Sequence, residues 1–268
     1  RRIALLCLDS PEFVAGFLGA IRVGVVPVPL NTLLRPADYE YLLNDSRARL
    51  LLVHRELWEP LEGIRERCRS LRHVVVIGEA PGGCLAYDDL MRQAGDACEP
   101  ADTSRDDVAF WLYSSGSTGF PKGTVHLQHD MLCCARGMGQ GVLGLTEEDV
   151  TFSAAKLFFA FGLGNNLYFP FTVGASAVLY AGRPLPDAIF EVIRRQRGEI
   201  DSERTMEILK GWSNPDSPRG PVRIDPKERD LIQNIYIRRV QKVDGRLQNI
   251  EFATIPTVKD PWKELNPN

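Results

Sequence analysis

The strongest constraint on the fold is an alternation, over residues 2–197, of short apolar runs with amphipathic stretches of helical length. Apolar runs of this length are typical of buried strands, and the stretches between them can supply the crossovers that parallel strands require. We therefore predict an α/β fold with a mostly parallel sheet covered by helices. The expected strands lie near residues 3–8, 50–53, 73–77, 108–113, 150–154 and 177–180, and the expected helices near residues 38–44, 57–68, 125–138 and 187–195. Ser10 and Pro11, a capping hydroxyl followed by a proline, predict the start of a further helix that ends at Gly24.

Composition and charge exclude several classes of protein. The 268 residues are 44% hydrophobic and 25% charged, which predicts a folded chain with a sizeable core. No apolar run approaches the ~18 residues of a membrane span. The net charge of -3 gives no broad positive field, so we expect no nucleic-acid partner.

The N-terminus and the cysteines suggest a cytoplasmic protein. Arg1 and Arg2 precede a short apolar run as in a signal peptide, but Asp9 interrupts the run and no cleavage site follows. The spacing of the six cysteines fits neither a zinc site nor a disulfide framework, so we expect reduced thiols. A start inside a predicted strand, without methionine, suggests that the chain is cut from something longer.

Local patterns predict a second part after Arg197. Residues 213–221 form a turn-rich loop, and residues 235–243 and 247–255 are strand-like runs joined at Asp244-Gly245, a dipeptide suited to a hairpin turn. We place the boundary at about residues 197–200, which gives a first domain of residues 1–197 and a short, mainly β tail of residues 198–268.

The segment richest in chemistry runs Tyr113-Ser114-Ser115-Gly116-Ser117-Thr118-Gly119-Phe120-Pro121-Lys122-Gly123. It follows a predicted strand and precedes a predicted helix. Its glycines can turn backbone N–H groups toward an anion, its hydroxyls add donors, and its lysine adds a positive charge. It is neither a Walker A loop nor a GxGxxG fingerprint. The alternative reading is a polar turn without a ligand.

This segment resembles the phosphate-binding signature of the adenylate-forming superfamily, which includes the acyl-CoA synthetases, luciferases and peptide-synthetase adenylation domains. Residues 152–165, with the sequence FSAAKLFFAFGLGN, resemble the acid-pocket segment of the benzoate–CoA ligase group. Residues 27–31 and 45–48 also fit that group. The resemblance covers Arg1 to about Arg197.

The resemblance implies a two-step reaction on an aromatic, benzoate-like acid. The carboxylate attacks the α-phosphate of ATP, giving an acyl-adenylate and pyrophosphate, and coenzyme A then displaces AMP; Mg2+ shares the phosphate charge. Lys122 and Thr118 are the expected catalytic residues. The expected nucleotide-binding residues are Ser114, Ser115, Gly116, Ser117, Thr118, Gly119 and Lys122.

Residues 158–164 are the expected acid-binding segment. Phe158, Phe159 and Phe161 could line a flat apolar slot for the aromatic ring, and Gly162 and Gly164 would let the backbone approach it. Phe161 stands where the family pattern has a tyrosine. Without the resemblance, a buried helix start explains this aromatic run better.

Two other clusters are weaker candidates. His126 and His129 lie three residues apart on a predicted helix, but no third ligand supports a metal site, so we read them as ordinary helix residues. Cys133 and Cys134, on the same predicted helix, are read as packing residues.

The tail resembles a different family. Residues 201–263 resemble the C-terminal end of ABC-type periplasmic branched-chain amino-acid-binding proteins, through segments 209–212, 217–221, 224–226, 233–238 and 256–262. The second sheet, acidic residue, ribose-binding aspartate and mobile catalytic domain of a full ligase are not found after Arg197. We therefore expect a fusion of two partial genes with marginal folding and negligible turnover. The alternatives are a transporter's substrate-binding component, for branched-chain amino acids or aromatic compounds, or an inactive fusion.

Overall fold

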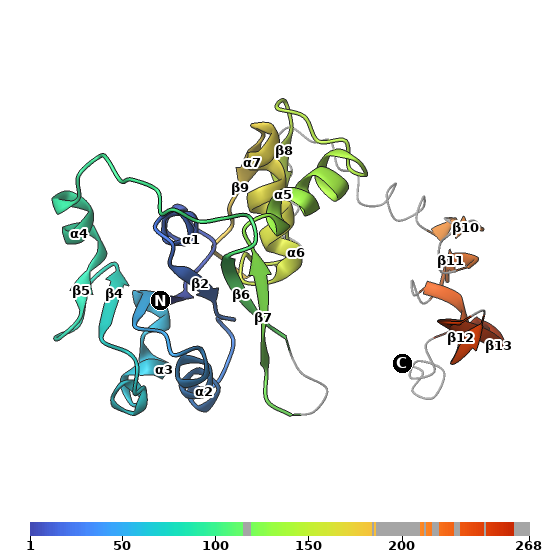
Figure 1. Cartoon of the computed structure of the whole chain (residues 1–268), viewed down its shortest axis with the longest axis horizontal. Coiled ribbons are helices and arrows are strands. Elements are labelled where there is room, and N and C mark those ends of the chain that lie inside the picture. Colours follow the sequence, from blue (N-terminus) through green and yellow to red (C-terminus); the bar gives the residue numbers. More distant parts are fainter. Residues whose placement is uncertain are drawn as a thin grey trace. The chain divides into compact units, whose positions relative to one another are not determined.

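Five parallel strands form the central sheet of the protein, in the order β2-β1-β3-β4-β5 (Figure 1). The structure is a computed structural model that describes residues 1–114, 119–183, 185, 210–211, 213–215, 220–227, 231–243 and 245–259. The strands are β1 (Arg2–Leu6), β2 (Val26–Pro29), β3 (Leu50–His54), β4 (His73–Ile77) and β5 (Leu85–Ala86). The predicted α/β class with a mostly parallel sheet is confirmed.

The chain divides into two units, Arg1–Leu185 and Pro186–Asn268, and each is described by itself. The predicted boundary at residues 197–200 and the predicted helix at residues 187–195 lie outside the described residues. No helix in the described part of the chain is both long enough and apolar enough to cross a membrane. All six cysteines are described, and each is free.

Helix α1 (Pro11–Arg22) has the start that its sequence predicts. The Ser10 hydroxyl accepts a hydrogen bond from the Phe13 N–H at 3.3 Å, and Pro11 occupies the first helical position, where no intrahelical N–H bond is lost. Gly24 follows the helix with a φ of +68°, a left-handed conformation that glycine adopts without strain.

The two faces of the central sheet carry separate hydrophobic clusters, because successive strand side chains point to opposite faces. Along β1, Ala4 and Leu6 pack on one face with side chains of α2 (Pro36–Ser46), whereas Leu5 packs on the other with Phe13 and Phe17 of α1. Helix α4 (Tyr87–Gln93) also contributes to the α1 side. Both sides of the sheet are therefore buried, as parallel sheets require.

One continuous helix was predicted at residues 57–68, and this prediction is wrong because the segment forms three short helices. The segment forms a 3-10 helix η1 (Arg55–Leu57), a short α3 (Glu59–Glu62) and a second 3-10 helix η2 (Arg65–Arg67). Pro60 lacks a backbone N–H, so it lies near the start of a helix rather than inside one, and Gly63 follows the last residue of α3.

The predicted helix at residues 125–138 is also wrong over its first five residues. Strand β6 (Val108–Ser114) pairs antiparallel with β7 (Lys122–Leu127), and helical structure begins only with α5 (Asp130–Cys134) and the π-helix η3 (Ala135–Gln140). The Asp130 carboxylate accepts the Leu127 N–H at 2.9 Å, at the junction between strand and helix. The Ser/Gly loop therefore joins two antiparallel strands, and not a strand and a helix.

Cys133 and Cys134 are exposed on α5, so their expected packing role is wrong. After η3 the chain forms β8 (Val150–Phe152), α6 (Ala160–Leu163), the π-helix η4 (Gly164–Tyr168), α7 (Phe169–Val173) and β9 (Ser176–Val178). Strands β8 and β9 pair in parallel, and the turn before α6 lies between them in sequence.

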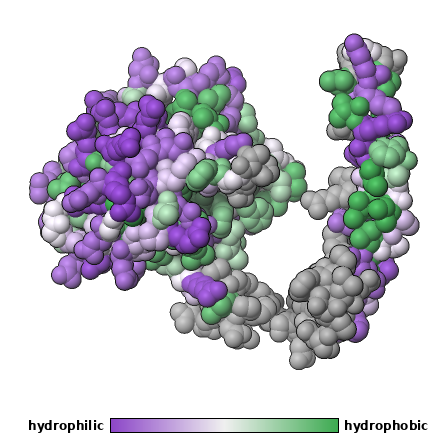
Figure 2. Space-filling view, turned by 90° about the horizontal axis from the view of Figure 1, so that it is seen from below, coloured by the Kyte–Doolittle hydropathy of each residue, from purple (hydrophilic) through white to green (hydrophobic). Residues whose placement is uncertain are grey.

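The second unit contains an antiparallel sheet in the order β10-β11-β12-β13. Its strands are β10 (Ser213–Asn214), β11 (Val222–Ile224), β12 (Leu231–Val243) and β13 (Arg246–Val258). Val243 pairs with Arg246, which confirms the predicted hairpin; Gly245 has a φ of +80°, and Asp244 lies outside the described residues. Val240 and Leu247 of this sheet are 66% and 76% exposed. The space-filling view shows hydrophobic residues at the surface of this unit (Figure 2).

Candidate functional site

The hairpin of β6 and β7 brings the two ends of the Ser/Gly loop together. Ser114, the last residue of β6, pairs with Lys122, the first of β7, and its hydroxyl donates to the Lys122 carbonyl at 3.5 Å. Lys122 is exposed. Gly119 has a φ of +116°, which strongly favours glycine, and a Cβ added there would meet nothing within 4 Å. Ser115, Gly116, Ser117 and Thr118 lie outside the described residues, so their roles stay predictions.

Helix α2 contacts both sides of this hairpin. The Tyr41 hydroxyl donates to the Pro121 carbonyl at 3.0 Å, and the Tyr41 ring stacks on Phe120 with centroids 4.8 Å apart. The Tyr113 hydroxyl donates to the Asp45 carboxylate at 2.6 Å. Burial is the main cause that raises the pKa of Tyr113, and the bond to Asp45 raises it further. The phenol therefore stays neutral and keeps donating at ordinary pH.

These α2 contacts were missed by sequence reasoning, which used Asp45 only as part of the family resemblance. The pairs are 80 residues apart for Tyr41 and Pro121 and 68 for Tyr113 and Asp45. No local pattern signals a contact over such a separation. The one available hint was the position of Tyr113, at the end of a predicted strand and directly before the Ser/Gly loop.

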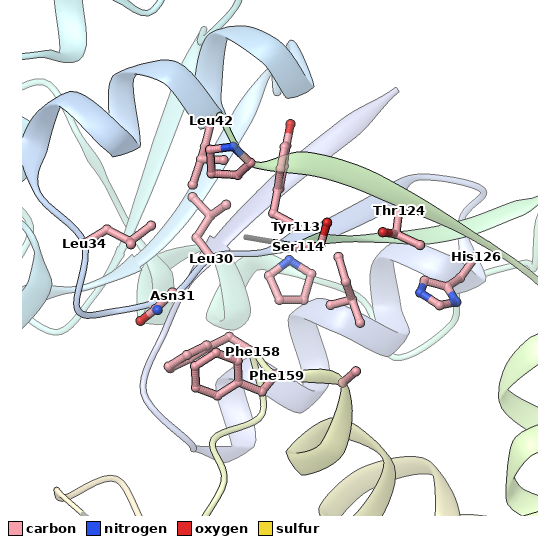
Figure 3. A pocket seen from close by; sticks show the side chains of 14 residues that line it. Leu30, Asn31, Leu34, Leu42, Tyr113, Ser114, Thr124, His126, Phe158 and Phe159 are labelled. Atoms are coloured by element: carbon pink, nitrogen blue, oxygen red, sulfur yellow. The ribbon is translucent and has the colours of Figure 1, made fainter. Parts of the chain in front are cut away.

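A cavity of about 580 Å³ lies beside the ends of the loop (Figure 3). In the close-up, Tyr113, Ser114, Thr124 and His126 come from the β6–β7 hairpin, and Phe158 and Phe159 lie across the cavity from them. Most of its lining is apolar, with a few polar groups, as in small-molecule sites. The lining residues are Pro29, Leu30, Asn31, Leu34, Leu42, Leu112, Tyr113, Ser114, Pro121, Thr124, His126, Phe158, Phe159 and Ala160.

The structure brings two of the three predicted slot aromatics to this cavity. Phe158 is 7% exposed and Phe159 is 46% exposed, and their rings lie 4.5 Å apart at a tilt of 53°. Phe161 is 70% exposed and does not line the cavity. A slot built from Phe158 and Phe159 is therefore compatible with the structure, whereas the part played by Phe161 stays a prediction.

The two predicted glycines make close approaches to their own chain. A Cβ at Gly162 would lie 2.2 Å from the Lys156 carbonyl oxygen, and one at Gly164 would lie 3.0 Å from the Phe169 ring. Neither glycine lines the cavity. Their small size is required by the fold of the segment, and direct contact with a ligand stays a prediction.

The two candidate histidines lie outside any helix, which corrects their predicted placement. His126 is on β7, lines the cavity and stacks on Phe110 with centroids 4.5 Å apart. His129 lies in the following turn. One Asp130 oxygen lies 3.5 Å from His126 Nδ1 and the other 3.3 Å from His129 Nε2. The described residues contain no group of three or more His, Cys, Asp or Glu side chains that could hold a metal ion.

Comparison with known proteins finds one family of enzymes. Residues 1–200 match the family of AMP-binding enzymes. The chain is 46% identical over 224 residues to a benzoate–CoA ligase of Thauera aromatica, a match that covers 83% of this chain and 42% of the relative. It is 43% identical over 194 residues to a 4-hydroxybenzoate–CoA/benzoate–CoA ligase of Rhodopseudomonas palustris, covering 72% of this chain and 36% of the relative.

Solved structures agree with this comparison. The crystal structure of the anthranilate CoA ligase AuaEII in complex with anthranoyl-AMP superposes with a TM-score of 0.71 at 45% identity, over 73% of this chain and 38% of that one. A benzoate CoA ligase from Burkholderia xenovorans LB400 gives a TM-score of 0.64 at 43% identity, over 72% of this chain and 37% of that one. The chain spans less than half the length of these relatives. The predicted resemblance of residues 201–263 to solute-binding proteins stays a prediction.

Proposed function

The chain belongs to the family of AMP-binding enzymes, and from this premise we propose that its first unit binds ATP and an aromatic carboxylic acid, as part of an AMP-forming aromatic acid–CoA ligase. The observation that carries the proposal is the position of the cavity. An apolar space of about 580 Å³, faced by Phe158 and Phe159, opens beside both ends of the Ser/Gly loop. A ring in that space would have its carboxylate within reach of a nucleotide held by the loop.

The proposed chemistry begins with two anions that repel each other. The acid's carboxylate attacks the α-phosphate of ATP, the bond to the β-phosphate breaks, and pyrophosphate leaves with the electron pair of that bond. Lys122, Thr118 and the loop between Ser114 and Gly119 would hold the leaving phosphates. Donors aimed at charge that develops in a dry site are worth about 3 kcal/mol each. The lysine at the start of β7 would thus favour departure of pyrophosphate.

The cavity wall supports an aromatic acid as the substrate class. The close pair of Phe158 and Phe159 offers ring faces and edges to a flat ligand, and aromatic contacts of this kind contribute about 0.5–1.5 kcal/mol beyond burial of area. The polar residues of the lining are Asn31, Tyr113, Ser114, Thr124 and His126. The relatives named above act on benzoate and 4-hydroxybenzoate or are named for anthranilate, which agrees with this class.

The full proposed reaction also requires Mg2+ and coenzyme A. Magnesium usually binds through substrate phosphates, waters and one or two carboxylates. The described residues form no cluster of ligands for it, so we assign it no protein ligand and derive no step through it. In the second half-reaction the thiol of coenzyme A would attack the acyl carbonyl, and AMP would leave.

Calorimetric titration of the 268-residue chain with ATP and with benzoate tests the proposal. We expect Lys122→Ala to weaken ATP binding about tenfold, because it removes a charged hydrogen-bond donor. Lys242→Ala is the matched control, since Lys242 is an exposed lysine of the second unit. A folded sample that binds no ATP, or equal effects of the two substitutions, would contradict the nucleotide site.

The acid site has its own matched pair of variants. Phe159 and Phe171 are 46% and 49% exposed, but only Phe159 lines the cavity. We expect Phe159→Ala to weaken benzoate binding about three- to tenfold, and Phe171→Ala to leave it unchanged. The same loss in both variants would argue against this cavity as the acid site.

A further inference from the structure

Asp9 is a buried carboxylate in the turn between β1 and α1, far in sequence from the acid-facing segment. The residue is 4% exposed, and its Oδ1 accepts the Leu157 N–H at 3.0 Å. Its Oδ2 lies 4.0 Å from Lys156 Nζ. Two consecutive residues of the segment before α6 thus contact the same carboxylate, across a separation of 148 residues.

Lys156 connects this carboxylate to a third part of the chain. Its ammonium donates to the carbonyls of Tyr180 and Gly182, the latter at 2.7 Å, and lies 5.2 Å from the centre of the Tyr180 ring. Burial lowers the pKa of Lys156, and the charge of Asp9 opposes this shift. The Lys156 ammonium therefore interacts with Asp9 and with the chain after β9. Lys156 does not line the cavity.

Burying the Asp9 carboxylate beside Lys156 costs free energy of hydration, so a structural purpose for the contact has to be sought. Burial raises the pKa of Asp9, and the Leu157 N–H and Lys156 oppose that shift. A buried ion pair adds little net stability compared with apolar residues of similar shape, because both charges lose their hydration. If residue 9 only had to fill space, a leucine of similar shape would stabilise the fold more than Asp9 does.

The geometry in question is that of the cavity wall. Leu157 is fully buried, and the next two residues, Phe158 and Phe159, line the cavity. The turn closes through the Phe159 N–H, which donates to the Lys156 carbonyl at 3.0 Å. Asp9 therefore holds the backbone N–H directly before the two rings, so a shift of that amide moves both rings.

We propose that Asp9 is a positioning residue for the aromatic acid: its hydrogen bond to the Leu157 amide sets where Phe158 and Phe159 meet the ring of the substrate. The inference rests on the proposed function of the cavity and extends it to a residue that does not touch the ligand. Binding sites need supporting residues of this kind. The side chains that touch the ligand must be held within about 0.5 Å of their productive positions, and residues that do not touch the ligand hold them there.

The test compares three substitutions in the 268-residue chain by calorimetry with benzoate and, separately, with ATP. Asp9→Leu keeps the approximate shape but removes the acceptor, whereas Asp9→Asn keeps an oxygen that can accept from Leu157. Asp89→Leu is the control, since Asp89 is an exposed aspartate on α4 paired with Arg92. Far-UV circular dichroism checks that each variant is folded, and Asp9→Ala replaces Asp9→Leu if that variant does not fold.

We expect Asp9→Leu to weaken benzoate binding about tenfold, because displaced Phe158 and Phe159 rings would lose about 1.4 kcal/mol of contact with the substrate ring, and to change ATP binding less than twofold. Asp9→Asn should restore benzoate binding to within about threefold of the unsubstituted chain. A merely structural role would lower the affinities for both ligands together and would give no selective rescue by asparagine.

The outcomes of this experiment separate an error in the role of Asp9 from an error in the proposed acid site. If the unsubstituted chain binds benzoate and Asp9→Leu binds it equally well, the positioning role is wrong and the proposed function stands. Equal losses for benzoate and ATP, or no rescue in Asp9→Asn, overturn the positioning role in the same way. If the folded, unsubstituted chain binds ATP but no benzoate, the acid site itself is wrong and the role of Asp9 falls with it.

Discussion

Replacing Gly162 by alanine places a methyl group where the backbone leaves no room. Gly162 lies in α6, and a Cβ there would be 2.2 Å from the Lys156 carbonyl oxygen, 2.3 Å from the Ala155 oxygen and 2.6 Å from the Lys156 carbonyl carbon. Ordinary contacts begin at 3.4 Å, so the turn would have to withdraw by more than 1 Å. All three obstacles are backbone atoms, which cannot rotate away as a side chain can.

The expected cost follows from that geometry. Overpacking in a well-packed region costs about 1–3 kcal/mol, and a clash with the backbone on three atoms places Gly162→Ala near 3 kcal/mol. With a urea m-value of about 2 kcal/mol/M, the unfolding midpoint should fall by about 1.5 M. Circular dichroism at 222 nm suits the measurement, because helices α1–α7 all lie in the first unit.

Gly19→Ala is the matched control for this prediction. Gly19 also lies in a helix, α1, but a Cβ there would meet nothing within 4 Å. Alanine in an open helical position should raise the free energy of unfolding by about 0.5–1 kcal/mol, because glycine loses more conformational freedom on folding. The reasoning is refuted if Gly162→Ala unfolds at the same urea concentration as the unsubstituted chain, or if the two alanine variants shift the midpoint equally.

Three further outcomes are expected. Ser10→Ala should lower the free energy of unfolding by about 1 kcal/mol in urea melts, because the Phe13 N–H loses its cap; Ser10→Asp should retain it, and equal losses in both would contradict the capping role. Tyr41→Phe should cost about 1 kcal/mol, because the bond to the Pro121 carbonyl is lost while the ring remains; an unchanged thermal melt would show that this bond contributes nothing. Burial lowers the pKa of His54 below 6.5, so the unfolded chain binds a proton more readily than the folded one. Stability should therefore fall as pH drops from about 6.5 toward the lowered value, with a slope of at most about 1.4 kcal/mol per pH unit, and His54→Asn should flatten this dependence in melts at stepped pH; an identical slope in the variant would refute the assignment.

Much of the fold could be predicted because its signals are local. A run of four to six apolar residues, such as β3 or β4, has to be buried on both faces, and helical stretches between such runs force a parallel sheet. The start of α1 was readable from Ser10 and Pro11, and the hairpin of β12 and β13 from Asp244-Gly245. In each case neighbouring residues determine the backbone conformation.

Strand β7 shows where local signals fail. Its sequence, KGTVHL, continues into a segment of helical length, and the sequence alone favoured one helix. Pairing with β6 decided otherwise: six residue pairs, from Val108 with Leu127 to Ser114 with Lys122, supply a ladder that no local pattern announces. Backbone hydrogen bonds to a partner strand outweigh helix propensities of a few tenths of a kcal/mol per residue.

The sequence by itself determined the fold class, because short apolar runs and helical stretches alternate along residues 2–197. It also predicted a nucleotide-binding loop and an aromatic segment, because each of these two signals lies in a short stretch of residues. Only the tertiary structure decided that Phe158 and Phe159 face a cavity while Phe161 does not, and that Asp9 holds the Leu157 amide. These facts depend on which distant residues meet, and a contact across 148 residues is set by the packing of the whole unit, whereas a sequence pattern records only its neighbours.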